Sequence, residues 1–535
     1  MQPILKNRYF LYLTEFFAGM SVMAVELGAS RLLAPYFSSS QIVWTIIIGT
    51  IMIAMALGNL YGGRSADRDP NPDRLYRRII LAAAWIALIP AVGKYIILGI
   101  SAVLIFSVNS NYLIWAAFAA CMVIFVFPLF LLGTVTPSLA KYTMDNLEDN
   151  ARIVGSLGAA NTVGSIIGTF VPTFVTIPSV GTSMTFLIFS GILLILALTY
   201  FFGTKQKSAA EIIGVVIFLF SCVLGYRSNF AFWKDNLLYE GVSVYNYLQV
   251  EETEDSIILS TNVLFGVQSI LSKEAGLTGM YYDYALAAPL MAGAEEKLAA
   301  GEEFKLLILG MGTGTYGSQC TRYYPAMQIE GVEIDEKISW LAREYFEMPE
   351  DLTVTTYDGR AYLHAVKEKY DVVLVDAYQD ITIPFQMSSA EFFRLVRDHL
   401  NDDGVMVVNM NMRGEKEGNI NQYLADTIAS IFPEVLTVDV PYITNRELFA
   451  GGNPLLTETM ERNIQLCKDD ELRGLLGQIR GNLIRYESGD YLMTDDCAPV
   501  ELLGIRVIDD LIREEVSWYK RVYEKYGIEG VIGSL

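Results

Sequence analysis

Histidine is nearly absent from this chain of 535 residues, and its cysteines are widely separated. There are two histidines, His364 and His399, so a histidine-built metal centre or a Ser-His-Asp triad has almost nothing from which to form. The five cysteines include no Cys-x-x-Cys pair, which argues against a zinc site or a redox dithiol. We therefore expect free thiols, no metal, and chemistry carried by carboxylates, amides, hydroxyls or backbone groups.

Positive charge is scarce in the C-terminal part of the chain. Residues 1–230 hold 14 Lys and Arg against 9 Asp and Glu, which leaves 25 basic against 51 acidic residues for 231–535. Such an excess of acid repels phosphate, so nucleic acid is not an expected partner. It attracts cations such as polyamines into a carboxylate-lined cleft, although acidity of this kind also serves solubility alone.

Apolar residues are concentrated in the first 230 positions. The hydrophobic content is 52% and the mean hydropathy is +0.34, both high for a soluble protein. Long apolar stretches, each sufficient for a hydrocarbon core of ~30 Å, lie near 10–34, 42–62, 79–100, 112–136, 153–177 and 183–203, with a shorter one at 211–227. We predict a polytopic helical membrane domain over residues 1–230, located in the cell membrane with the lipid bilayer as a partner.

The basic residues between these stretches predict an orientation. They follow the second stretch, separate the fourth from the fifth, and follow the sixth, whereas the intervening loops have no Lys or Arg. The positive-inside rule therefore places the N-terminus and the basic loops in the cytoplasm. If all seven stretches crossed the membrane, residues 231–535 would lie outside the cytoplasm. We expect a cytoplasmic catalytic domain instead, with 211–227 re-entrant or partly crossing.

Two charged residues, Glu26 and Arg31, lie in or near the first stretch. Charges at such depth need polar partners or a polar cavity. Pairing with groups on other helices, such as Asn59 or Asn161, is one reading, and a cation pathway is the other.

Beyond about Gly241 the pattern changes to short strands. The segments Ser243–Glu251 and Ser256–Ser260 predict a small β-hairpin cap, which with its linker occupies residues 231–285. Buried strand-like runs then alternate with amphipathic helical segments, which predicts a doubly wound, Rossmann-like α/β domain of the class I methyltransferase type over residues 286–535. The expected strands are Lys305–Leu309, Gln328–Glu333, Leu352–Thr356, Asp371–Val375 and Gly404–Met410.

A glycine-rich turn follows the first of these strands. Gly310, Gly312 and Gly314 carry no side-chain bulk, so the backbone there can approach a ligand closely. Glu333 ends the second strand about 20 residues later, the offset at which a carboxylate accepts hydrogen bonds from ribose hydroxyls. A plain tight turn and a surface acid are the alternatives. We predict a nucleoside site formed by these four residues.

Acids also end the third and fourth strands. Asp358-Gly359 closes the third strand, where the carboxylate can accept from an adenine amino group, cap the following helix, or both. Asp376 ends the fourth strand at the edge where chemistry occurs in this architecture. We predict that Asp376 is catalytic and that Asp371, at the start of that strand, is structural.

These residues together resemble the spermidine synthase family of polyamine aminopropyltransferases. The acids Glu333, Asp358 and Asp376 stand in the family's order, and the segments 243–247 and 277–284 resemble its cap. The segments 26–28 and 31–37 resemble the membrane-integral branch of that family. Two family motifs are altered: Thr313 stands where the glycine-rich motif has its acid, and Gln379, an amide, stands where the run that begins with Asp376 has its second acid.

The resemblance implies roles for further residues. Asn246 takes the place of a cap glutamine that touches the nucleoside, Tyr282 that of a polyamine-binding tyrosine, and Asp283 that of a residue at the aminopropyl group. Gln379 and Asp380 are expected to bind the polyamine substrate. Tyr442 is a candidate for the family's late polyamine-binding tyrosine.

The reaction implied is transfer of the aminopropyl group of decarboxylated S-adenosylmethionine to putrescine or a related amine, which gives spermidine and methylthioadenosine. No permanently bound cofactor is expected, and a second copy of the chain is a further expected partner. An S-adenosylmethionine-dependent methyltransferase is one alternative, and a non-catalytic polyamine transporter or sensor is another. Asp283 favours a donor with an ammonium group over one with a carboxylate, and Asp376 argues against a purely binding role.

Overall fold

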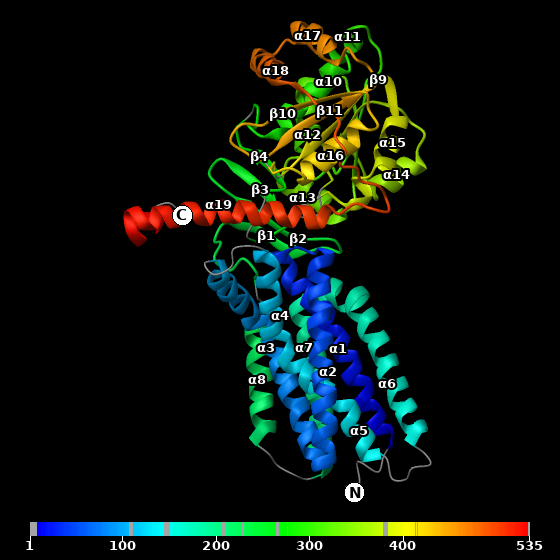
Figure 1. The fold of residues 1–535 in the computed structure, drawn as a ribbon, viewed down its shortest axis with the longest axis vertical. Coiled ribbons are helices and arrows are strands. Elements are labelled where there is room, and N and C mark those ends of the chain that lie inside the picture. The colour runs from blue at the N-terminus through cyan, green and yellow to red at the C-terminus, as the bar shows by residue number, and fades with distance from the viewer. Residues whose placement is uncertain are drawn as a thin grey trace. The chain divides into compact units, whose positions relative to one another are not determined.

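The structure is a computed structural model that describes residues 8–105, 111–143, 150–204, 209–226, 229–263, 267–274, 276–377, 383–411, 413–414 and 416–532. The chain divides into two units, Met1–Lys234 and Asp235–Leu535 (Figure 1). The sequence predicts boundaries at 230 and 285, and this three-part division remains a prediction.

The first unit is a helical bundle. Its elements are α1 (Arg8–Phe37), α2 (Gln41–Arg68), α3 (Pro72–Ile105), α4 (Tyr112–Gly133), α5 (Val135–Thr143), α6 (Asn150–Val171), η3 (Pro172–Thr176), α7 (Ile177–Thr204) and α8 (Ala209–Gly225). Small residues let α1 and α6 pack closely: a Cβ added at Gly164 would lie 2.0 Å from the Phe16 carbonyl oxygen, and one at Gly168 would lie 2.1 Å from that of Met20.

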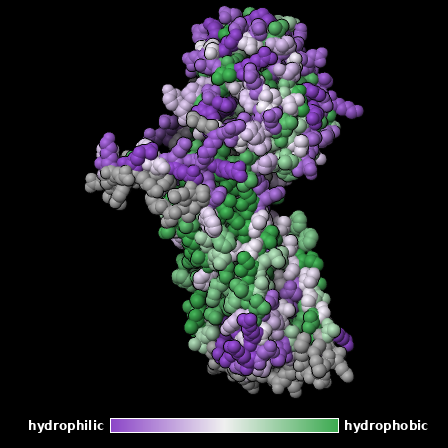
Figure 2. All heavy atoms as spheres, viewed as in Figure 1, coloured by the Kyte–Doolittle hydropathy of each residue, from purple (hydrophilic) through white to green (hydrophobic). Residues whose placement is uncertain are grey.

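Within the described residues, five helical runs are long and apolar enough to cross a membrane. The fifth and sixth predicted stretches form a single run of 54 residues, Ala151–Thr204. This run is broken at Gly181, whose φ of 84° and ψ of 172° are not helical. The predicted stretch at 211–227 corresponds to the 17-residue helix α8. Much of the surface of this unit is apolar (Figure 2), and Met52 and Val223 are among its exposed apolar residues. Such a surface is compatible with a membrane protein.

The charged residues of α1 differ in their burial. Glu26 and Arg31 are half-buried, whereas Glu15 is fully buried. The Glu15 carboxylate accepts hydrogen bonds from Thr136 Oγ1 at 2.5 Å and from Asn161 Nδ2 at 2.8 Å. Pairing between helices therefore involves the predicted Asn161, but with Glu15 as its partner.

The second unit begins with a four-stranded antiparallel sheet in the order β1 (Leu237–Val242), β2 (Tyr247–Glu252), β3 (Ser256–Ser260), β4 (Ser269–Ser272). The predicted hairpin covers only β2 and β3, so the sequence analysis found two of the four strands. It also started the first of them too early, because residues 243–246 form a turn in which the Ser243 amide donates to the Asn246 carbonyl at 2.8 Å.

The larger sheet has eight strands in the order β12-β10-β11-β9-β8-β5-β6-β7. The five predicted strands are present and parallel: β5 (Lys305–Leu309), β6 (Gln328–Glu333), β7 (Thr353–Thr356), β8 (Tyr370–Val375) and β9 (Leu400–Met410). Strand order reverses between β5 and β8, which makes this edge the switch point of a doubly wound sheet. Three further strands were not predicted: β10 (Glu434–Asp439), β11 (Arg446–Gly451) and β12 (Ile484–Arg485). Strand β11 pairs antiparallel with β9, and β10 pairs antiparallel with both β11 and β12, so β10 runs in the direction of the five parallel strands.

Helices lie on both faces of this sheet, whereas the last helix, α19, extends away from it (Figure 1). In chain order, the helices of the unit are α9 (Tyr281–Ala285), α10 (Ala287–Met291), α11 (Ala294–Ala299), α12 (Thr315–Tyr323), α13 (Glu336–Tyr345), α14 (Gly359–Ala365), η4 (Phe385–Met387), α15 (Ala390–Asp398), α16 (Ile420–Ala429), α17 (Leu456–Leu466), α18 (Asp470–Asn482) and α19 (Val500–Ile532). This arrangement, with an antiparallel strand inserted beside β9, is the Rossmann-like fold of the class I methyltransferase type that the sequence predicts.

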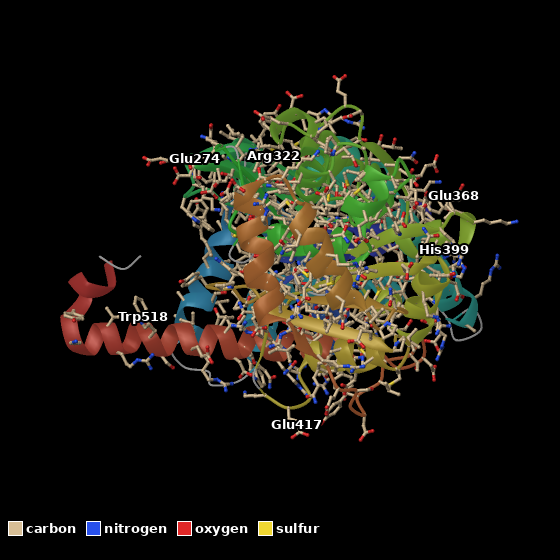
Figure 3. All side chains as sticks on the ribbon, turned by 90° about the horizontal axis from the view of Figure 1, so that it is seen from above. Glu274, Arg322, Glu368, His399, Glu417 and Trp518 are labelled. Atoms are coloured by element: carbon tan, nitrogen blue, oxygen red, sulfur yellow. The ribbon has the colours of Figure 1, made fainter. Side chains whose placement is uncertain are left out.

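The acidic residues of the second unit serve two purposes. Glu274, Glu368 and Glu417 are exposed and point outward from its surface (Figure 3), as expected for acids that confer solubility. Asp371 is buried at the start of β8, where its carboxylate accepts from Lys297 Nζ at 2.7 Å and from the Lys305 amide at 2.9 Å. Its predicted structural role agrees with these contacts.

Candidate active site

A cavity of about 290 Å³ lies in the second unit at the carboxyl ends of β5, β6 and β8. The four-stranded sheet supplies part of its wall through Leu259, Thr261, Gln268 and Ser269. Its volume is near the lower end of ligand pockets, which begin at roughly 300 Å³. The cavity therefore suits a small molecule held between the two sheets.

Of the three glycines that the sequence predicts in this turn, Gly310 and Gly312 line the cavity and Gly314 does not, and Gly310 is packed against the end of β8. Gly310 has a φ of +90°, and a Cβ there would lie 2.4 Å from the Asp376 carbonyl oxygen. Gly312 also has a positive φ, and its amide donates to Glu333 Oε2 at 2.9 Å. Gly314, at φ +82°, directly precedes α12. Only glycine combines these backbone angles with such close approach.

Glu333, at the end of β6, is buried and lines the cavity. Its second carboxylate oxygen, Oε1, accepts from the Asp335 amide at 3.0 Å. Burial raises the pKa of Glu333 to about 7, although the amides of Asp335 and Gly312 oppose this shift. The backbone therefore fixes the carboxylate in place, and its remaining lone pairs can accept from hydroxyl groups of a ligand.

Asp358 and Gly359 also line the cavity. Asp358 is the N-cap of α14, and its Oδ1 accepts from the Ala361 amide at 2.8 Å. The capping interpretation is confirmed, and it leaves Oδ2 able to accept from a ligand. Gly359 is the first residue of α14.

Asp376 follows β8 directly and faces the cavity as a half-buried residue. Its Oδ2 accepts from the Tyr281 hydroxyl at 2.7 Å and its Oδ1 accepts from Asn409 Nδ2 at 2.9 Å. Desolvation raises the pKa of Asp376 to about 7, although these two hydrogen bonds favour the ionised form. A carboxylate in this state is suited to binding an ammonium group and taking a proton from it near neutral pH.

The residues that the family resemblance added are not all placed at the cavity. Asn246 and Tyr282 line it, and Asn246 Nδ2 donates to Asp335 Oδ2 at 3.1 Å. Asp283 does not; its carboxylate accepts from Thr278 Oγ1 at 3.0 Å and from the Gly279 amide at 2.7 Å. These bonds organise the turn before α9. The predicted contact of Asp283 with the aminopropyl group thus has no support from the cavity and remains a prediction.

Three further predicted site residues are not placed at the cavity by the structure. Gln379 and Asp380, predicted to bind the polyamine, lie outside the described residues. Tyr442 is fully exposed and does not line the cavity, so the structure gives no support to its candidate role.

Two side chains that hold Asp376 were missed by the sequence analysis. Tyr281 bonds to Asp376, whereas the analysis selected its neighbour Tyr282, whose hydroxyl donates to the Gln268 carbonyl at 3.2 Å. The two rings lie 4.0 Å apart. Asn409 lies near the end of β9, the strand beside β8. A polar residue at the end of a buried strand is the feature of the sequence that could have identified it. Within the described residues, no group of His, Cys, Asp and Glu could hold a metal ion.

Comparison with known proteins identifies the class of enzyme. The family described as "Spermine/spermidine synthase domain" matches residues 292–449. A "Probable polyamine aminopropyl transferase" of Bifidobacterium longum is 49% identical over 352 residues, which are 63% of this chain and 77% of that protein. A "Polyamine aminopropyltransferase" of Vibrio vulnificus is 26% identical over 53% of this chain and 92% of its own length. The chain belongs to the spermine/spermidine synthase family.

Solved structures of the same family are also similar. Spermidine synthase from Thermotoga maritima is 16% identical, covering 46% of this chain and 88% of its own, with a TM-score of 0.37. A probable spermidine synthase from Corynebacterium glutamicum is 19% identical, covering 47% and 96%, with a TM-score of 0.33. As a family member the protein is a polyamine aminopropyltransferase, an enzyme whose co-substrate is decarboxylated S-adenosylmethionine.

Proposed function

We propose that the cavity binds decarboxylated S-adenosylmethionine and that Asp376 is the base for aminopropyl transfer to putrescine or a related diamine. The observation that carries this proposal is the placement of Asp376, a carboxylate at the cavity wall held by Tyr281 and Asn409. The glycine turn and Glu333 are proposed to bind the ribose, and Asp358 with Gly359 the adenine. The acceptor then lies near Asp376 and Tyr282.

In this mechanism the acceptor amine arrives mostly as an ammonium, because free alkyl amines of this kind have a pKa near 10. Asp376 binds the ammonium and takes its proton. The nitrogen lone pair then forms a bond to the methylene carbon beside the sulfonium, while the C–S electron pair returns to sulfur. The products are neutral methylthioadenosine and the extended amine. Holding both reactants in line supplies much of the rate.

The four-stranded sheet is proposed to act as the cap of this site. It supplies Gln268 and Ser269 to the cavity wall, and Ser269 Oγ accepts from the Thr313 amide at 3.4 Å. The cap thus contacts the turn that is proposed to bind the donor. A second copy of the chain remains a predicted partner.

The purified protein is expected to convert putrescine and decarboxylated S-adenosylmethionine to spermidine and methylthioadenosine. Mass spectrometry of the products distinguishes this reaction from its rival, because a methyltransferase given S-adenosylmethionine would produce a methylated amine and S-adenosylhomocysteine. Detection of only the second pair of products would refute the proposal.

The catalytic unit is proposed to face the cytoplasm, since the basic residues between the apolar stretches predict that their loops are cytoplasmic. Helix α8, at 17 residues, spans about 26 Å, somewhat less than a hydrocarbon core of ~30 Å. A topology reporter fused after Leu535 is expected to be active in the cytoplasm, and a second reporter fused before α8 supplies the control. A periplasmic or extracellular signal from the first fusion would contradict this placement.

A further inference from the structure

Glu447, on β11, is an acid at the active-site edge of the sheet to which no role has been given. Its side chain is completely buried. Within the described part of the chain, neither carboxylate oxygen has a hydrogen-bond partner, and no ion pair with Lys or Arg includes it. A buried charge without partners is strongly unfavourable, so this carboxyl is expected to be neutral in the empty site.

The strand register places Glu447 in one row with Asp376. Val375, the residue before Asp376, pairs with Val408 in the parallel ladder between β8 and β9, and Asn409 pairs with Glu447 in the antiparallel ladder between β9 and β11. Residues directly opposite each other project from the same face of a sheet. Asn409 therefore lies between the two carboxyl groups, and it donates to Asp376 Oδ1.

Among the described residues that pack around Glu447, the titratable groups are acids and phenols. Helix α9 packs over β9 and β11 and supplies Tyr281 to this layer, and α12 supplies Tyr316. Complete burial raises the pKa of Glu447 well above its usual range, and the neighbouring Asp376 raises it further. Two carboxyls in one layer of low dielectric cannot both ionise readily, and Asp376, which accepts two hydrogen bonds, is the one that ionises first.

We propose that Glu447 is a second acid of the polyamine site, which keeps its proton while the site is empty and releases it to solvent when a polyamine cation binds beside Asp376. The arriving positive charge offsets the cost of the second carboxylate. Glu447 acts through this charge and does not touch the substrate, so it is a positioning residue. The inference rests on the proposed role of Asp376.

The test counts the protons released on binding, by calorimetry in buffers of different ionisation enthalpy near pH 7. Methylthioadenosine alone and putrescine added to the methylthioadenosine complex are the two probes. In the wild type, putrescine is expected to release protons from Asp376 and Glu447, whereas methylthioadenosine is expected to release protons only from Glu333, because burial raises the pKa of both Glu333 and Asp376 to about 7. In Glu447→Gln, putrescine should release up to one proton fewer and bind roughly 10-fold more weakly, with unchanged affinity for methylthioadenosine.

Two further variants separate this role from a structural one. Glu447→Asp keeps an acid and is expected to retain the proton release. Glu434→Gln removes a different buried glutamate, one paired with Arg485 at 2.8 Å, and should match the wild type. If Glu447→Gln and the wild type released equal numbers of protons, the proposed role of Glu447 would be wrong, but the proposed function would stand. Failure of putrescine to bind the wild type at all would instead refute the proposed function.

Discussion

Replacing Asp376 with asparagine is expected to lower turnover by roughly 10²–10⁴, the usual contribution of a positioned general base. Asparagine has nearly the same shape, and its amide oxygen can still accept one of the bonds from Tyr281 and Asn409. It cannot, however, take a proton from the attacking ammonium. Binding of methylthioadenosine should therefore persist while spermidine formation nearly stops, which calorimetry and a product assay would show.

The pH profile provides an independent check on the same residue. Asp376 must be ionised to act as a base, and its pKa is raised to about 7. The wild-type kcat/KM is therefore expected to fall as the pH drops below about 7. If Asp376→Asn turned over normally and Asp380→Asn were inactive, the base would be Asp380 and the residue assignment would be wrong, though not the reaction.

Replacing Glu333 with glutamine is expected to weaken nucleoside binding by about 1–3 kcal/mol, because charge-assisted bonds to the ribose hydroxyls are lost. The glutamine carbonyl can still accept from the Gly312 amide, which holds the turn, but its NH2 group cannot accept from the Asp335 amide. Calorimetry with methylthioadenosine measures the change directly.

A matched control is available on the same strand. Glu330 lies three residues before Glu333 on β6, and its carboxylate accepts from the hydroxyls of Tyr362 and Tyr370. Because it does not line the cavity, Glu330→Gln should bind methylthioadenosine as the wild type does. An unchanged affinity in Glu333→Gln would mean that the nucleoside binds elsewhere.

The parts of the fold that depend on local pattern could be predicted from the sequence. The predicted ranges for β5 and β6 coincide with the observed strands. Strand β5 is a short apolar run bounded by turn residues, which is a local pattern. The acids Glu333, Asp358 and Asp376 could be located because each lies at the end of a predicted strand or just after it. The carboxyl edge of a parallel sheet brings such residues together whatever lies between them in the sequence.

The side chains that surround Asp376 could not be predicted from such local patterns. Asn409 and Glu447 come together through an antiparallel pairing of β9 with β11, and such register is a long-range property that no local pattern encodes. The choice between Tyr281 and Tyr282 depends on the direction of a short helix of five residues. The hairpin prediction was incomplete, because it contained β2 and β3 but not β1 and β4, which flank them in the four-stranded sheet.

The close packing at Gly310 has a consequence for how the protein tolerates sequence change. The carbonyl of Asp376 occupies the space that any side chain at position 310 would need, at 2.4 Å from its Cβ. Even alanine would push the glycine turn and the end of β8 apart. Donor binding at the turn and proton removal by Asp376 would then be lost together. In a saturation library selected for growth without added spermidine, position 310 should accept glycine alone, and no second mutation confined to the donor pocket should restore it.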